Sequence, residues 1–279
     1  MKRTTRSGLF IFLLSATYSL HADPSVQSIL SATEGKATLG KPITVTLQWS
    51  RNDHPPKTHG YKYFAEKWKG LLGQVDGVTA HLAEGFPDAA RWQKSDLVIV
   101  YLTQQFLDEK KFRIMQDYIA RGGDLIVLHQ GMVQRKHSEK WADVMGIAFQ
   151  FGQPKSSWGK HADPIYLNTE HPIFAGFPET LQYKDELYWN LIQGKRGKVN
   201  VIGHTRAPKQ AADDHTKHPV FWTVEDGSGK DQSRVFGCVI GHWDSIFDEA
   251  HFQIALLRAT GWVLGESVKP FEAVTTVQD

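Results

Sequence analysis

The sequence predicts an α/β protein with a mostly parallel sheet, helices on both faces and an antiparallel extension. Two observations carry this prediction. Short apolar runs alternate with stretches of helical periodicity through the first half of the chain and again near its end. Polar residues, several of them histidines, follow directly where these runs stop. A β-α-β-α-β alternation favours right-handed crossovers, which bring successive strands parallel in one sheet.

The apolar runs predict five core strands. These are residues 43–49, 78–82, 97–102, 124–128 and 235–240. Three other stretches repeat apolar residues at the spacing of an amphipathic helix, namely 59–73, 109–121 and 248–264. Asp108 is the expected N-cap of the second helix, and Gly122-Gly123 is its expected end.

The middle third of the chain, residues 147–230, has a different character. It is rich in Pro, Gly, Trp and His, and it contains no helical pattern of useful length. Short strand-like runs recur at 164–167, 187–192, 199–204 and 220–224. We expect this region to extend the same sheet with antiparallel strands and long loops.

The N-terminal segment, residues 1–22, is typical of an export signal. Three basic residues precede the short apolar run Leu9–Leu14, and Leu20-His21-Ala22 offers a cleavage site. The run is too short to span a bilayer stably, so a retained anchor is the less favoured alternative. We therefore expect an exported protein, periplasmic or extracellular. It would have a flexible mature N-terminus (23–36), one domain (37–268) and a C-terminal tail (269–279).

Composition excludes several classes of function. The 32 basic and 30 acidic residues nearly balance, which gives no reason to expect nucleic acid or an anionic membrane as a partner. No later segment is apolar enough for a membrane span. The sequence lacks a P-loop and a G-x-G-x-x-G motif, so no nucleotide cofactor is expected. The single cysteine, Cys238, lies in an apolar strand and is expected to be a buried structural residue.

Histidines follow three of the expected core strands. His54 and His59 come after the first strand, His129 ends the fourth, and His242 follows the last. Gln104 follows the third strand. In an open parallel sheet, ligands bind at the carboxyl ends of the strands. These positions therefore predict one polar pocket rather than scattered surface histidines.

The same residues have structural explanations. His129 is expected to act as a base or a metal ligand, although a buried histidine bonded to the backbone would also fit. Asp185 and Glu186 stand beside Tyr188, and on a strand only one of these two carboxylates would reach the pocket. Carboxylate with imidazole suits acid–base chemistry and divalent metals, whereas a solvated turn is the alternative. The other histidines lack a comparable position and are expected to be structural or exposed.

The ordered set of motifs resembles the ThuA-like family of trehalose-utilisation proteins, within the class I glutamine amidotransferase-like superfamily. The resemblance covers nearly all the mature chain. Its segments are HPPKTHGY (54–61), DLVIVY (96–101), RGGDLIVLHQG (121–131), HPIFAGF (171–177), DELYWN (185–190), HPVFW (218–222), RVFGCVIGH (234–242) and the closing helix (252–265).

This resemblance implies a flavodoxin-like sheet, and it puts His129 where glutamine amidotransferases keep a catalytic cysteine. Glutamine hydrolysis is therefore not expected. The resemblance instead implies sugar utilisation, with 3-keto-glycosides as the proposed substrates. Such glycosides can be cleaved by elimination and hydration, which needs a base and stabilisation of an enolate.

We assign roles to individual residues on this basis. The catalytic candidates are His129, Asp185 and Glu186, and the candidates for sugar contacts are Gln104, Trp158 and Tyr188. Zinc or a similar divalent ion would be held by His54, His59, His129 and His242. The expected partner is a small-molecule or oligosaccharide substrate, and a homo-oligomer is left open. The alternative function is a non-catalytic carbohydrate-binding domain of a polysaccharide-degradation system.

Overall fold

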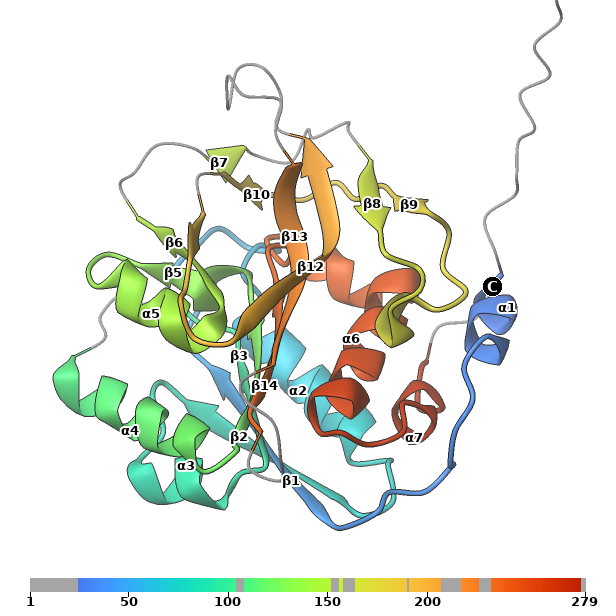
Figure 1. Cartoon of the computed structure of the whole chain (residues 1–279), viewed down its shortest axis with the longest axis horizontal. Coiled ribbons are helices and arrows are strands. Elements are labelled where there is room, and N and C mark those ends of the chain that lie inside the picture. Colours follow the sequence, from blue (N-terminus) through green and yellow to red (C-terminus); the bar gives the residue numbers. More distant parts are fainter. Residues whose placement is uncertain are drawn as a thin grey trace, which may run out of the picture.

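A computed structural model describes residues 25–103, 108–151, 164–189, 191–206, 217–225 and 232–276, together with the backbone of 156–157 (Figure 1). The expected export signal, residues 1–22, lies outside these ranges, and so do Gln104 and Trp158.

A nine-stranded sheet in the order β2-β1-β3-β4-β14-β13-β12-β8-β9 forms the centre of the molecule. Its first five strands are mutually parallel, and the remaining four continue it in antiparallel fashion. The parallel strands are β1 (Ile43–Trp49), β2 (Val78–Glu84), β3 (Leu97–Val100), β4 (Asp124–Leu128) and β14 (Arg234–Cys238). The antiparallel strands are β13 (Lys217–Glu225), β12 (Lys198–Arg206), β8 (Ile165–Leu167) and β9 (Thr180–Leu181). The predicted fold class is thereby confirmed.

Two small sheets lie beside the carboxyl edge of the parallel strands. One pairs β10 (Leu187–Tyr188) with β7 (Ser156–Ser157). The other contains β5 (Val133–Gln134), β6 (Ile147–Gln150) and β11 (Ile192–Gln193). In the described part of residues 147–230, the helical structure consists of the short 3-10 turn η2 (Pro172–Phe174), as the sequence led us to expect.

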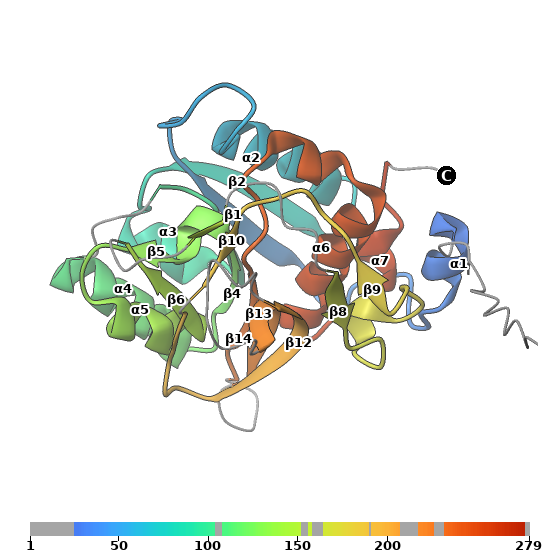
Figure 2. The same ribbon diagram turned by 90° about the horizontal axis from the view of Figure 1, so that it is seen from above.

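Helices cover both faces of the sheet (Figure 2). One face carries α2 (Tyr61–Leu72) and α6 (Ala250–Val263), and the other carries α3 (Ala89–Lys94), α4 (Glu109–Ala120) and α5 (Ser138–Met145). The three long helices had been predicted. In α2 the buried Phe64, Trp68 and Leu71 recur at helical spacing. The carboxylate of Asp108 accepts the Lys111 N–H, which confirms the predicted N-cap of α4.

Four helices form where the sequence pattern predicted none. The stretch expected to be a flexible N-terminus contains α1 (Val26–Ser31), in which Val26 and Ile29 are buried. The expected C-terminal tail begins with α7 (Lys269–Glu272), whose Phe271 is fully buried. The other two are α3 and α5. Because each of the four is short, tertiary contacts rather than intrinsic propensity hold it.

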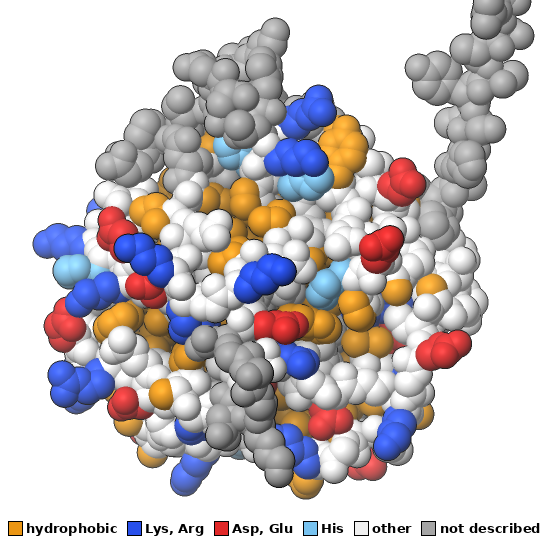
Figure 3. Space-filling view, in the orientation of Figure 1, with side chains coloured by type: hydrophobic (Ala, Val, Ile, Leu, Met, Phe, Trp, Pro, Cys, Tyr) orange, Lys and Arg blue, Asp and Glu red, His pale blue; other side chains and the backbone are white. Residues whose placement is uncertain are grey.

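The outer surface is mixed in character. On the face seen in Figure 3, acidic and basic side chains are interspersed among the residues that the structure describes. In those same parts of the chain, no helix has the length and apolar character needed to cross a membrane.

The carboxyl ends of β1, β3, β4 and β14 meet at one edge of the sheet. Two 3-10 turns follow these strands, η1 (His129–Met132) after β4 and η3 (Asp244–Asp248) a short distance after β14. The η1 turn packs closely on β3, since a Cβ on Gly131 would lie 2.4 Å from the Val100 carbonyl oxygen. The segments that follow β1, β4 and β14 therefore meet at this edge, and each of them contains histidine.

Candidate metal centre

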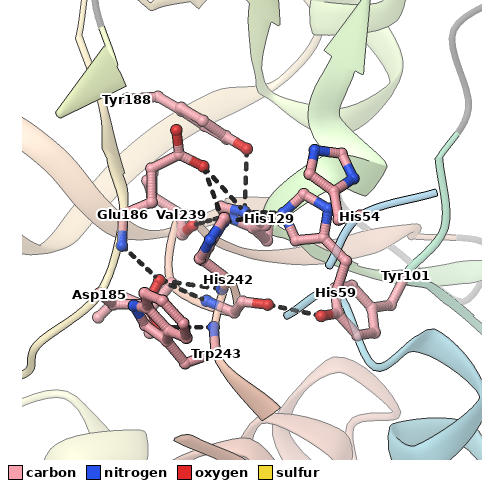
Figure 4. A network of polar contacts seen from close by, with 12 residues as sticks. His54, His59, Tyr101, His129, Asp185, Glu186, Tyr188, Val239, His242 and Trp243 are labelled. Carbon is pink, nitrogen blue, oxygen red and sulfur yellow. Dashed lines mark hydrogen bonds and ion pairs between the residues drawn. The ribbon is translucent and has the colours of Figure 1, made fainter. Parts of the chain in front are cut away.

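Three imidazoles and one carboxylate converge at the carboxyl edge of the sheet (Figure 4). His59 Nε2 lies 3.1 Å from His129 Nε2 and 2.9 Å from His242 Nδ1. Glu186 Oε2 lies 3.4 Å from His129 Nε2 and 3.2 Å from His242 Nδ1. At most 4% of each of the four residues is exposed. Four potential ligand atoms thus surround one point inside the protein.

Two of these histidines, His59 and His129, have unusual backbone conformations that set the direction of their side chains. His59 has a φ of 50° and His129 a φ of 44°, both in the left-handed region that residues other than glycine rarely adopt. Such conformations cost of order 1–3 kcal/mol each and persist only where the surroundings impose them. Here the His59 N–H donates to the His242 carbonyl at 2.8 Å, which joins the loop after β1 to the loop after β14.

Hydrogen bonds fix the tautomers of two of the imidazoles. His129 Nδ1 lies 2.6 Å from the Val239 carbonyl oxygen, which can only accept, so Nδ1 carries the proton. Tyr61 Oη donates to Asp53 Oδ1 at 3.4 Å and lies 3.2 Å from His59 Nδ1. Its hydroxyl can therefore accept the His59 Nδ1–H. In these tautomers the Nε2 atoms of His59 and His129 both direct lone pairs at the common point.

This donor set fits a divalent metal ion. Lone pairs that face one another repel, and a cation between them would turn that repulsion into bonding. Zinc binds His nitrogen and carboxylate oxygen at about 2.0–2.2 Å in tetrahedral geometry, which separates the ligand atoms by about 3.3 Å. The four contacts between these ligand atoms, at 2.9–3.4 Å, are close to that separation. His59, His129, His242 and Glu186 could therefore hold zinc or a similar ion.

The protonation states agree with this arrangement. Burial, reinforced by the neighbouring imidazoles, lowers the pKa of His59 to about 2, so its ring is neutral as a metal ligand must be. Burial alone would raise the pKa of Glu186. The neighbouring His129 and His242 rings outweigh that effect and hold the pKa of this carboxyl below its usual range. Glu186 is therefore ionised.

Asp185 faces away from the cluster and binds backbone. Its carboxylate accepts the N–H groups of Glu186 at 2.7 Å, His242 at 2.9 Å and Gly241 at 3.2 Å. Burial raises its pKa, although the backbone N–H groups oppose that shift. Of the two neighbouring carboxylates, Glu186 reaches the pocket, whereas Asp185 ties the segment that carries Glu186 to the segment that carries His242.

Tyr188 and His54 border the cluster without completing it. Tyr188 Oη lies 3.0 Å from His129 Nε2, and the two rings stack with centroids 4.8 Å apart. His54 does not share the common point. Its Nδ1 lies 2.7 Å from Asp53 Oδ1, and its ring packs on His59 with centroids 3.7 Å apart. Asp53, His54 and His59 form a second, more exposed group of potential ligands.

The sequence interpretation missed three residues that shape the site. Asp53 and Tyr61 set the His59 tautomer, and Tyr101 Oη donates to the Gly241 carbonyl at 2.5 Å. A signal existed for each, because Asp53 and Tyr61 stand close to His59 in the sequence and Tyr101 stands near the end of the apolar run 97–102. Polar atoms of buried tyrosines need partners, and these strand ends offer them.

The chain is therefore an α/β domain with a flavodoxin-like sheet. A buried cluster of three histidines and one glutamate lies at the carboxyl edge of that sheet and is a potential metal centre. Residues 44–263 match the family model described as "ThuA: Trehalose utilisation". The chain belongs to this ThuA family, which confirms the resemblance and gives it a family role in the utilisation of trehalose or related sugars. A search of curated proteins gives no match.

Solved structures agree on the fold. A ThuA-like protein from Bacteroides uniformis is 17% identical, with a TM-score of 0.62 over 86% of this chain and 98% of that chain. A second from Parabacteroides merdae is 18% identical, with a TM-score of 0.59 over 81% and 92%. A GH42 β-galactosidase from G. stearothermophilus is 10% identical, with a TM-score of 0.50 over 81% of this chain and 31% of that one.

Proposed function

We propose that the protein is an exported, metal-assisted enzyme of sugar utilisation that cleaves oxidised (3-keto) glycosides. The observation that carries this proposal is the buried cluster of His59, His129, His242 and Glu186. Membership of a trehalose-utilisation family supports a sugar substrate. If a substrate oxygen added as a further ligand, a divalent ion held by the cluster would act on it as a Lewis acid, which suits a reaction that develops enolate charge.

The proposed reaction is an elimination followed by hydration. The ketone at C3 acidifies the C2 proton, which a base removes. The C1–O bond then breaks, and the leaving oxygen takes up a proton to give an alcohol. Water next adds across the resulting C1–C2 double bond, with hydroxyl on C1 and hydrogen on C2, so the net change is hydrolysis. The reaction needs no redox cofactor, since the ketone is regenerated.

We assign roles to the chain's own residues. His59, His129, His242 and Glu186 would bind the ion. His54 is the proposed base, because its Nδ1 lies 2.7 Å from the Asp53 carboxylate and this contact leaves Nε2 as proton acceptor. Tyr188 Oη, beside His129, would donate to a sugar oxygen. Asp185 acts through the backbone as a positioning residue.

The test of this proposal is turnover of 3-keto-trehalose in D₂O, with trehalose as the comparison. We expect cleavage of the ketone, deuterium at C2 of the released ketosugar and no cleavage of trehalose. Binding of both sugars without turnover would contradict the enzyme proposal and indicate the carbohydrate-binding alternative. Export through residues 1–22 is tested separately, by the N-terminal sequence of the protein recovered outside the cytoplasm.

The role of His54 has its own test. Replacing His54 with Gln should reduce deuterium exchange at C2 by about 100-fold, the usual contribution of a positioned base. The metal content of the His54→Gln variant should stay at the wild-type level, since His54 lies outside the four-ligand cluster. Loss of metal together with loss of exchange would show that His54 is a ligand rather than the base.

A further inference from the structure

A groove lies beside the segments that build the metal centre. The loop after β9 and the turn η3 line it, together with the first turn of α6, and they enclose a volume of about 580 Å³. The chain that leaves β9 passes the start of α6 on its way to β10 (Figure 2). A volume of this size is within the range of small-molecule sites, about 300–1,000 Å³.

Two chain segments connect the groove with the metal centre. Along one, Lys184 lines the groove, Asp185 binds backbone, and Glu186 reaches the cluster. Along the other, His242 belongs to the cluster and Ser245 lines the groove. Because Asp185 accepts the His242 N–H at 2.9 Å, the two segments are fixed to each other between the two sites.

An exposed aromatic ring lies at this junction. Trp243 follows the cluster residue His242, and its ring centroid lies 4.9 Å from the His242 ring. The backbone N–H of Trp243 contacts Asp185 Oδ2 at 3.5 Å. Its side chain is among the few large apolar ones that remain exposed, at 36%. An indole in this position can offer an apolar face to a ligand while its N–H stays available for a hydrogen bond.

The lining of the groove suits a neutral, polyhydroxylated ligand. Its floor includes the buried Leu181 and Ile246, and exposed polar side chains surround that floor. Lys184 and Glu249 bring opposite charges, so the lining favours neither a polyanion nor a polycation. Sugar rings combine apolar C–H faces with many hydroxyls. They therefore match an apolar floor with a polar rim.

We infer that this groove is a remote carbohydrate subsite, which holds further sugar units of an oligosaccharide whose reacting end lies at the metal centre. The placement of the reacting end rests on the proposed function, whereas the binding of sugar in the groove does not depend on it. The substrate class that follows is an oligosaccharide longer than a disaccharide. Chain length should then raise affinity through contacts at the groove.

The experiment measures the equilibrium binding, without turnover, of trehalose and of three tetrasaccharides, namely maltotetraose, cellotetraose and xylotetraose. Ser245→Trp fills the groove from an exposed position on η3. Thr79→Trp is the matched control, since Thr79 is exposed on β2, at the opposite edge of the nine-stranded sheet. A second variant, Lys184→Ala, removes a rim group that is exposed and plays no part in the core.

We expect at least one tetrasaccharide to bind more tightly than trehalose. Ser245→Trp should weaken the binding of that tetrasaccharide about tenfold, or by about 1.4 kcal/mol. Lys184→Ala should weaken it in the same direction, and Thr79→Trp should leave it unchanged. Equal affinity in Ser245→Trp and wild type, or no binding of any tetrasaccharide, would overturn the inference. Length-dependent binding in a protein that holds no metal would refute the metal mechanism but leave the groove assignment standing.

Discussion

At the scale of single residues, the candidate site depends on which nitrogen of each histidine carries a proton. The Val239 carbonyl holds the His129 proton on Nδ1, and Tyr61 with Asp53 does the same for His59. Partners of this kind orient metal-ligating imidazoles and raise their basicity. The site therefore depends on these hydrogen bonds as well as on the ligand atoms, because the bonds set the orientation and tautomer of the imidazoles.

Replacing Tyr61 with Phe tests this view directly. The variant keeps the buried ring but removes the hydroxyl that accepts from His59 Nδ1. We expect the dissociation constant for zinc to rise at least about tenfold, as measured by competition with a chelator. Tyr63→Phe, on the same helix but with an exposed hydroxyl that binds Asp248, is the matched control. Unchanged affinity in both variants would mean that Tyr61 is only a packing residue.

The sequence predicted the potential metal ligands better than it predicted the residues that hydrogen-bond to them. His59, His129 and His242 follow apolar runs, and strands of a parallel sheet end at a common edge. Glu186 was one of two adjacent carboxylates, and the sequence could not show which one the backbone would engage. The Tyr61 contacts could not be predicted, because they depend on side-chain directions that only the folded loop fixes.

At the scale of secondary-structure elements, the long and strongly periodic segments were predictable. The five core strands and the helices α2, α4 and α6 formed close to where the sequence indicated. Short elements escaped prediction, since α3 has six residues and α5 eight, and their stability comes from the contacts around them.

The start of β4 offers a prediction about pH. Asp124 Oδ1 accepts the Arg234 N–H at 2.8 Å where β4 meets β14, and burial raises the pKa of Asp124 to about 7. In the unfolded chain this pKa is about 3.9, so the folded state binds more protons between those values. Stability from this group is therefore full below about pH 4 and is lost as the pH rises toward 7.

Asp124→Asn should remove that pH dependence. The amide oxygen can still accept the Arg234 N–H, and no charge forms in the buried position. At pH 8 we expect the variant to be more stable than wild type, by on the order of 1–4 kcal/mol, and the difference to shrink at pH 4. Denaturant unfolding at the two pH values measures it. A variant less stable than wild type at pH 8 would show that the ionised carboxylate is stabilising.

At the scale of the whole molecule, one buried arginine joins elements from both ends of the described chain. Arg258 on α6 donates to Glu272 on α7, to the Ile29 carbonyl on α1 and to the Ala175 carbonyl after η2, each at 2.6 Å. Thr33 Oγ1 donates to the other oxygen of Glu272 at 2.6 Å. This network explains why the expected flexible N-terminus and the expected C-terminal tail both contain ordered helices.

Arg258→Met should therefore destabilise the whole fold. It removes the fully buried partner of Glu272, whose carboxylate keeps only the Lys269 ion pair and the Thr33 hydroxyl. Removal of one member of a buried ion pair typically costs about 3–5 kcal/mol. Denaturant unfolding measures the loss, with Arg51→Met as a control because Arg51 forms only an exposed ion pair with Glu84. An Arg258→Met protein as stable as the control would show that the network adds no net stability.

The measurement that tests the central claim most directly is the metal content of the purified protein, determined by elemental analysis after purification without chelators. We predict close to one equivalent of zinc or a similar divalent ion per chain, and its loss in His129→Ala while the circular dichroism spectrum is retained. Absence of metal from the wild type even after reloading, or equal metal in the folded His129→Ala variant, would contradict the assignment of His59, His129, His242 and Glu186 as a metal centre.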